Sequence, residues 1–205
     1  MSIISVDLSI QSSSFAVYDG NKTKLYVYTN KTKKSFRIDT PTIKLTVIPH
    51  PKDLPEDDFQ RYMVLADGLF YYMYQNLCDD TKVYLEGYSY ASKGLVFNIS
   101  EFCALFKRQL YPHYIPTIVP PSEWKKAIVG KGNATKEEVA DYIRYIAYPH
   151  DSRVVELGEF NDRQCKAKNS DMYDAILMSD KAALSASALS LQSILTHRTR
   201  RHAFH

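Results

Sequence analysis

The fold of this chain is decided by residues 2–29, which read SIISVDLSIQSSSFAVYDGNKTKLYVYT. Three segments of this stretch, 2–7, 13–18 and 24–29, are apolar or alternate between apolar and polar residues, which is typical of β-strands. Between the last two segments, Asp19-Gly20-Asn21 supplies residues that tolerate a positive φ in a tight hairpin. The sequence therefore predicts that the fold opens with three antiparallel strands.

Helices and strands are predicted to alternate after this opening. The further predicted strands cover residues 43–48, 81–86 and 114–119. The predicted helices begin at an N-cap pair of Asp53 and Glu56, at residue 96, at a capping box of Thr135 and Glu138, and at residue 171. We therefore expect an α/β fold, with a mixed sheet of three antiparallel strands followed by parallel strands and with helices on both faces.

The composition is that of one folded domain. The chain has 205 residues, of which 45% are hydrophobic and 24% are charged, and this length suits a single core. We expect residues 1–195 to form the domain and residues 196–205, which are rich in arginine and histidine, to form a basic tail. No apolar run approaches the roughly 20 residues that a membrane span needs, so no membrane partner is expected.

Cysteine content and net charge indicate the compartment but not the partner. The cysteines Cys78, Cys103 and Cys165 are odd in number and lack metal-site spacing, which favours reduced thiols and a cytoplasmic location. A net charge of +3 is too small to indicate nucleic-acid binding by itself. Basic residues cluster within 22–37 and in the tail, and such clusters support that function only beside a nuclease site.

Four carboxylates lie where a sheet and a helix can bring them together. Asp7 ends the first strand, Glu86 ends the strand at 81–86, and Asp171 and Asp174 are one helical turn apart on the last helix. If the two strands are neighbours, all four side chains reach one edge of the sheet. Carboxylates packed this closely repel one another unless cations neutralise them.

The ligand type predicts the metal and the chemistry. Oxygen ligands prefer Mg²⁺, with Mn²⁺ as its substitute. Two such ions can activate a water for attack on phosphorus and stabilise the leaving oxygen. We therefore expect these four acids to be catalytic residues and the ligands of two Mg²⁺ ions. Taken singly, each acid has an ordinary alternative, as a polar strand end or as a partner of the helix dipole.

A glycine- and lysine-rich element lies between the second and third acids. Residues 121–136 read PSEWKKAIVGKGNATK. The element is not a Walker loop, and no nucleotide cofactor is expected. Its glycines allow close backbone approach, and the amides of the next helix predict a phosphate site to which Lys125, Lys131 and Lys136 add charge. The alternative is an ordinary turn between helices with solvated lysines.

With these motifs the sequence resembles the RuvC-type Holliday-junction resolvases of the RNase H-like superfamily, particularly the smaller phage and viral members. The likeness runs from the strand ending in Asp7 through residues 85–90 and 124–139 to residues 171–175. It implies an RNase H-like nuclease domain and a homodimer that resolves four-way DNA junctions by symmetrical, Mg²⁺-dependent nicks, in the host cytoplasm if the source is a phage or virus. In that family the acids equivalent to the four named above bind Mg²⁺, and lysines matching Lys125 and Lys136 contact DNA.

The segment after Glu86 resembles the loop with which these resolvases probe the junction. The resemblance implies DNA contacts by Tyr88, Tyr90 and Lys93, with the rings stacking on unpaired bases. The segment after the first acid departs from the family, because Leu8-Ser9-Ile10-Gln11 stands where many relatives have proline and glycine. The helix at 96–110 has more apolar surface than one buried face needs, which either a dimer contact or burial in its own domain would explain.

Several other functions remain as alternatives. Within the same superfamily, these are a broader nuclease for forks and flaps and a ribonuclease for RNA–DNA hybrids. A junction-binding protein without cleavage is the non-enzyme alternative. A nucleotide-binding fold of the actin or sugar-kinase type also opens with a strand ending in Asp, but residues 8–14 lack the glycines of its phosphate loop.

Overall fold

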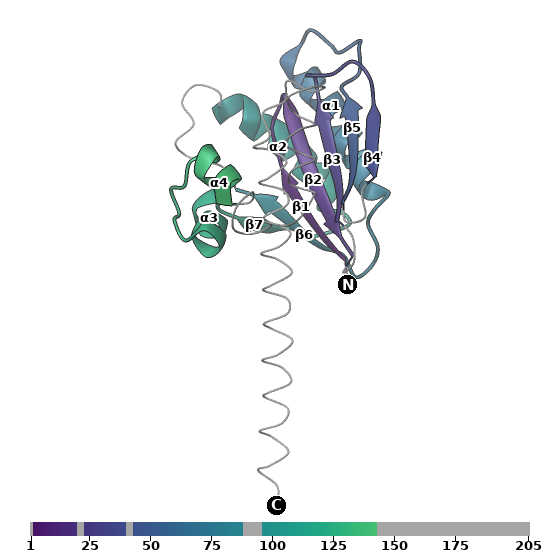
Figure 1. Cartoon of the computed structure of the whole chain (residues 1–205). Helices are drawn as coiled ribbons and strands as arrows, with labels where there is room; N and C mark the ends of the chain where they lie inside the picture. Colours follow the sequence, from purple (N-terminus) through teal and green to yellow (C-terminus); the bar gives the residue numbers. More distant parts are fainter. Residues whose placement is uncertain (1, 20–22, 40–42, 88–95, 143–205) are drawn as a thin grey trace, which may run out of the picture.

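A mixed seven-stranded sheet forms the centre of the computed structural model, which describes residues 2–19, 23–39, 43–87 and 96–142 (Figure 1). The strand order is β4-β5-β3-β2-β1-β6-β7. The strands are β1 (Ile3–Asp7), β2 (Ser12–Tyr18), β3 (Thr23–Thr29), β4 (Phe36–Asp39), β5 (Ile43–Pro49), β6 (Lys82–Glu86) and β7 (Thr117–Val119). The helices are α1 (Asp58–Tyr74), α2 (Val96–Leu110), α3 (Pro121–Val129) and α4 (Lys136–Tyr142).

The strand β1 lies in the middle of the sheet, and all five of its residues are buried. It pairs antiparallel with β2, which pairs antiparallel with β3. On its other side β1 is parallel to β6, which is parallel to β7. The predicted mixed sheet, with three antiparallel strands first and parallel strands after them, is therefore confirmed.

Alternation along β1 separates a core face from the face that carries the first acid. Ile4 and Val6 belong to the main hydrophobic core, as do their register partners Val17 and Phe15 on β2. Because successive side chains of a strand point to opposite faces, Asp7 lies on the other face. The apolar residues of β1 anchor the strand, and the acid lies where it ends.

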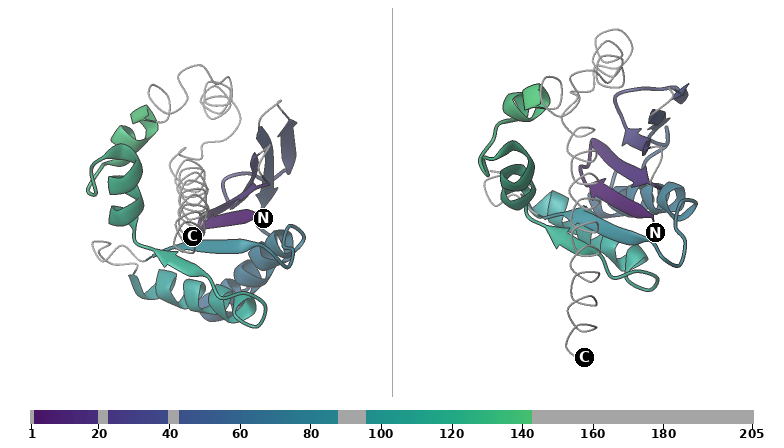
Figure 2. Two further views of the ribbon diagram at one scale, coloured as in Figure 1. Left: turned by 90° about the horizontal axis from the view of Figure 1, so that it is seen from below. Right: turned by 60° about the horizontal axis from the view of Figure 1, so that its bottom comes forward.

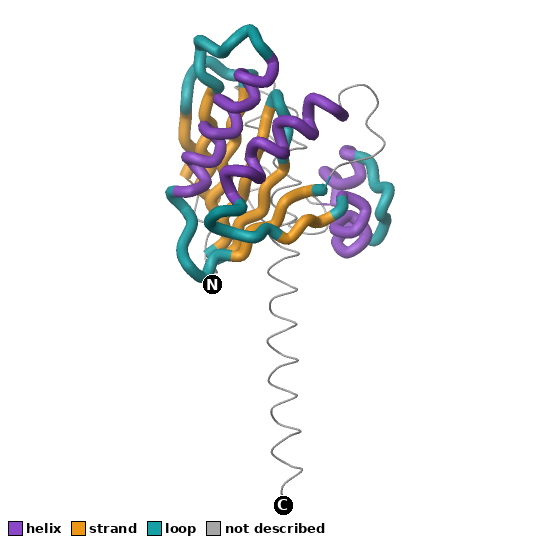
Figure 3. The backbone as a smooth tube through the Cα atoms, turned by 180° about the vertical axis from the view of Figure 1, so that it is seen from behind, coloured by secondary structure: helices purple, strands orange, loops and turns teal. Residues whose placement is uncertain are grey.

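The helices α1 and α2 cover the core face of the sheet (Figure 3). The buried residues of α1 recur every three or four positions and form one stripe: Tyr62, Leu65, Ala66, Leu69 and Met73. α2 adds a second stripe: Phe102, Cys103, Phe106 and Leu110. These side chains join the apolar residues of β1, β2 and β6 in one core, which fixes the sheet on this side.

The helices α3 and α4 lie on the side of the sheet away from α1 and α2, beyond the end of β7 (Figure 2). A small second core joins them to that strand through Val119, Trp124, Ala134 and Val139. Helices therefore lie on both sides of the sheet, as predicted, although α3 and α4 pack at its β7 edge. The predicted capping box is also confirmed, since Thr135 N donates to Glu138 Oε2 at 2.7 Å and Glu138 N donates to Thr135 Oγ1 at 3.2 Å.

Two predicted boundaries were wrong, and one strand was missed. Helix α1 is capped by Asp57, whose side chain accepts from Gln60 N, rather than by Asp53 and Glu56. Strand β7 begins only after Pro116, whose ring removes the amide that a ladder needs. Strand β4 was missed, because its four half-exposed residues give a short alternation at the sheet edge. The helix predicted from residue 171 lies outside the described residues.

The helix α1 approaches the sheet closely at one point. A Cβ placed on Gly68 would lie 2.5 Å from the hydroxyl oxygen of Tyr28 on β3. Glycine fits there without any shift of Tyr28 or of the helix, because it has no side chain. Among the residues that the structure describes, no helix combines the length and apolar character needed to cross a membrane.

Candidate active site

Two of the four predicted acids are brought together by the pairing of β1 and β6. These strands are parallel, and their register ends with Val6 opposite Leu85, so Asp7 and Glu86 are the next residues along. Since Val6 and Leu85 both face the main core, the two carboxylates both face the opposite side. The two strands are adjacent, which was the condition for Asp7 and Glu86 to reach one edge of the sheet.

The two acids differ in their surroundings. Asp7 is 8% exposed, whereas Glu86 is partly exposed. A carboxylate as buried as Asp7 needs partners or a cation to offset its lost hydration. The edge therefore presents one enclosed and one more open carboxylate, which lie beside each other in the sheet.

Sequence reasoning missed the hydrogen bond that Glu86 accepts from Trp124. The indole Nε1 donates to Glu86 Oε1 at 3.1 Å. Trp124 is fully buried at 0% exposure and forms the centre of the small core between β7, α3 and α4. A lone tryptophan in a lysine-rich helix was the available signal, because a buried indole N–H requires an acceptor.

Two lysines of the glycine- and lysine-rich element, Lys125 and Lys131, have partners within the protein. Lys125 Nζ donates to the carbonyl of Ala134 at 3.0 Å and lies 5.6 Å from the ring centroid of Trp124. Lys131 Nζ pairs with Glu138 Oε1 at 2.6 Å. Lys136 is the first residue of α4. Because an ammonium has three donors, Lys125 and Lys131 retain capacity for a further ligand.

The glycines of this element shape the turn between α3 and α4. Gly130 has a φ of +83° and ends α3 in the left-handed conformation. A Cβ on Gly132 would approach the carbonyl oxygen of Ser122 to 3.0 Å. The close approach that the glycines permit is thus between two parts of the chain. The capping box uses the amide of Glu138, so the amides that open α4 are not all free for a phosphate.

The remaining predicted site residues lie outside the described residues: Asp171, Asp174, Tyr88, Tyr90 and Lys93. Within the described ranges, no three side chains of the types His, Cys, Asp or Glu come together as a metal site. The described part of the predicted metal site therefore consists of Asp7 and Glu86. Two carboxylates offering only oxygen suit a hard cation such as Mg²⁺ or Mn²⁺.

The fold of this chain is RNase H-like. No protein-family model and no curated protein sequence matches the chain. Among solved structures, it is similar to RuvC of Thermus thermophilus, with 16% identity, a TM-score of 0.51, and coverage of 92% of this chain and 96% of RuvC.

Two further solved structures show the same fold. T. thermophilus RuvC in complex with a Holliday junction substrate matches with 15% identity and a TM-score of 0.53, over 92% of this chain and 96% of that chain. The yeast mitochondrial Holliday junction resolvase Ydc2 matches with 14% identity and a TM-score of 0.51, over 86% of this chain and 75% of that chain. At these identities the likeness establishes the fold, and the fold resembles that of the resolvases.

Proposed function

We propose that this protein is a homodimeric, Mg²⁺-dependent endonuclease that resolves four-way DNA junctions by symmetrical nicks. The observation that carries the proposal is the placement of Asp7 and Glu86 as neighbours at the ends of parallel strands of an RNase H-like sheet. The similarity to RuvC and to Ydc2 supports the choice of substrate, since both are described with Holliday junctions.

In this proposal the four acids share one task. Asp7, Glu86, Asp171 and Asp174 hold divalent cations, and the enclosed Asp7 offers the least hydrated carboxylate of the described pair. Bound cations would activate a water and stabilise the leaving 3′-oxygen. Lys125, Lys131 and Lys136 supply positive charge to the DNA backbone beside them. Tyr88, Tyr90 and Lys93 contact the branch point.

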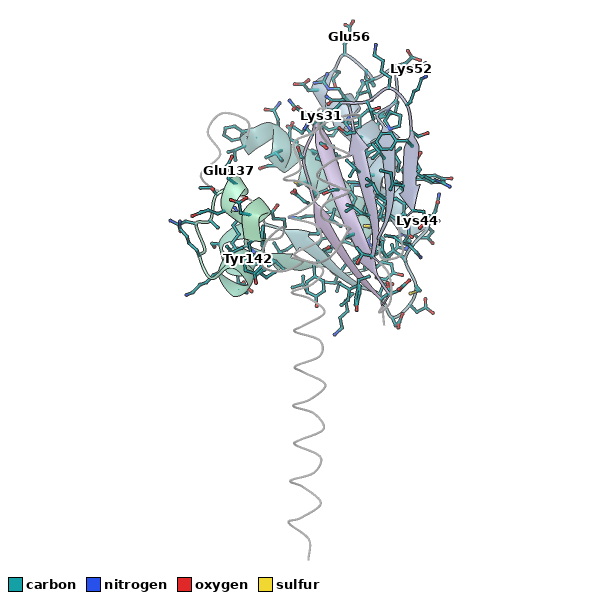
Figure 4. All side chains as sticks on the ribbon, in the orientation of Figure 1. Lys31, Lys44, Lys52, Glu56, Glu137 and Tyr142 are labelled. Carbon is teal, nitrogen blue, oxygen red and sulfur yellow. The ribbon has the colours of Figure 1, made fainter. Side chains whose placement is uncertain are left out.

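Two lysines elsewhere on the same edge could contact a DNA substrate. The strands β1, β3 and β5 run in one direction, so the ends of all three lie on the edge that carries Asp7. Lys31 follows β3 and Lys52 follows β5, and Figure 4 places both at that end of the sheet, where it also labels Glu56. Each phosphate contact that such lysines make would add to the salt dependence of binding.

The direct test is cleavage of synthetic four-way, forked and linear DNA by the purified full-length chain, with and without Mg²⁺. We expect symmetrical nicks in the four-way substrate only when Mg²⁺ is present, and loss of all cleavage in excess chelator. Equal cutting of forks and flaps would indicate a general debranching nuclease. Cutting of RNA–DNA hybrids alone would indicate a ribonuclease, and binding without any cleavage would indicate a junction-binding protein.

Replacement of the enclosed acid separates catalysis from binding. We expect Asp7→Asn to lower the cleavage rate by more than about 100-fold, because even partners that only orient a metal ligand typically contribute 10- to 100-fold. Junction affinity, measured by fluorescence anisotropy, should persist. The exposed Asp79→Asn is the matched control and should cut normally. Parallel loss of binding and cutting in Asp7→Asn would point to a folding role instead.

A further inference from the structure

Trp124 is the chain's only tryptophan, and its ring is fixed on several sides. It packs among Val119, Ala134 and Val139 and has no exposed surface. Lys125 lies over the ring and ties α3 to the segment before α4 through the carbonyl of Ala134. The indole is therefore held in one position by the packing of the small core between β7, α3 and α4.

The single polar atom of this ring is directed at the proposed site. An indole can only donate a hydrogen bond, and Trp124 Nε1 donates to Glu86 Oε1 at 3.1 Å. A glutamate side chain has three rotatable torsions and loses conformational entropy whenever it is fixed in one orientation. A rigid donor that orders this carboxylate in advance removes that loss from the step in which a ligand binds.

We propose that Trp124 is a positioning residue that orients the Glu86 carboxylate for divalent-cation binding beside Asp7. The inference rests on the proposed function only in taking Glu86 as a cation ligand. Partners that orient a metal ligand typically contribute 10- to 100-fold in affinity. Because the indole bonds directly to the carboxylate, its fluorescence also reports the charge state around Glu86.

The first test uses the natural tryptophan of the full-length chain without DNA. Emission is recorded while Mg²⁺ is added at constant ionic strength, and we expect a saturable change. Glu86→Gln keeps an oxygen that can accept from the indole but removes the negative charge, so its midpoint should rise at least tenfold or the change should vanish. Glu123→Gln, an exposed acid next to Trp124 in sequence, should respond like the unmodified chain.

The second test removes the donor. Trp124→Phe should bind Mg²⁺ about tenfold more weakly by isothermal titration calorimetry. In junction cleavage, its half-saturating Mg²⁺ concentration should rise by a similar factor, while the maximal rate falls much less. Circular dichroism establishes whether this variant is folded. If Trp124→Phe is not folded, the Glu86→Gln fluorescence titration tests the inference instead, since that variant retains the tryptophan.

The outcomes separate this inference from the proposed function. An emission change that is identical in Glu86→Gln, the absence of any Mg²⁺ response, or a folded Trp124→Phe with unchanged Mg²⁺ affinity would each overturn the role of Trp124. A chain that shows the expected Mg²⁺ response but cuts no DNA would refute the nuclease and leave the positioning role intact.

Discussion

The charge of Glu86 affects the pKa of the Cys103 thiol, but this thiol is not expected to bind a metal or to react. The pKa of this thiol is raised to about 12, mainly by burial; Lys107 lowers it, and the negative charge of Glu86 adds to the rise. A thiol must lose its proton before it can bind a metal or attack a substrate. At neutral pH Cys103 therefore remains protonated, and the described edge offers only oxygen ligands.

His50 makes stability depend on pH at a site remote from the acids. Desolvation lowers the pKa of its ring to about 4, against the opposing effect of a backbone hydrogen bond with Tyr28. The unfolded chain binds this proton near pH 6.5, so between these values the unfolded state holds more protons. Stability from His50 is complete above about pH 6.5 and is lost as the pH falls toward 4.

We expect the free energy of unfolding in urea to fall by roughly 1 to 2 kcal/mol between pH 7 and pH 4.5 on account of His50, since partial exposure screens some of the shift. The variant His50→Gln should lose this part of the slope, because it has no group that titrates there. An unchanged slope in the variant would assign the pH dependence to other groups.

At the scale of elements, the turn from α3 to α4 depends on its capping box and on one ion pair. The pKa of Glu138 is lowered, first by its hydrogen bond with Lys131 and then by the backbone amide of Thr135. A carboxyl with a lowered pKa stabilises the fold above its ordinary pKa and loses this contribution as the pH falls through the lowered value. The turn is thus held in its most stable form at neutral pH.

Removal of the capping hydroxyl tests this turn. We expect Thr135→Ala to reduce stability by about 1 kcal/mol, the usual cost of losing a helix N-cap. Hydrogen exchange of the amides in α4 should accelerate accordingly. Thr135→Ser, which retains the oxygen, is the matched control. Unchanged exchange in the alanine variant would contradict a structural role of the capping box.

Most strands could be predicted because their signals are local. The alternation in β2 and β3 and the apolar run in β1 each indicate a strand without knowledge of the rest of the chain. The strand β4 could not be recognised, because four residues at a sheet edge with half-exposed side chains are too short for a clear period. The start of α1 was misplaced since several acids precede it and only geometry selects Asp57 as the cap.

The candidate site could be predicted only in part, because it depends on contacts between distant segments. The sequence places Asp7 and Glu86 at strand ends, but their adjacency follows from the pairing of β1 with β6. The bond from Trp124 to Glu86 joins residues 38 positions apart and depends on how α3 packs against β7. Such packing has no periodic signature in the sequence.

At the scale of the molecule, the apolar residues of α2 fit both explanations of its excess apolar surface, namely burial within the domain and a dimer contact. Leu105 packs against the main core, so burial within the domain accounts for that residue. Phe97 is 83% exposed. A large exposed aromatic ring is typical of an interface, so we propose that Phe97 contributes to the proposed dimer.

If the proposed dimer forms through Phe97, we expect Phe97→Asp to yield a monomer, because a buried charge without a partner opposes association. Sedimentation velocity measures the mass, and the monomer should introduce unpaired nicks in four-way DNA. Tyr71→Asp alters a similarly exposed ring on α1 and should leave the mass unchanged. Dimers that persist in Phe97→Asp would place the interface elsewhere.

The contact between Gly68 and Tyr28 reverses a common rule of protein engineering. Replacing a glycine inside a helix by alanine normally stabilises a protein, since alanine favours helix and restricts the unfolded chain. Here the added methyl group would occupy the space of the Tyr28 hydroxyl oxygen, so either the buried Tyr28 ring or α1 would have to shift. The close packing of the phenol against α1 therefore depends on a single missing methyl group, and a consensus-style thermostabilisation of this chain should leave that position untouched.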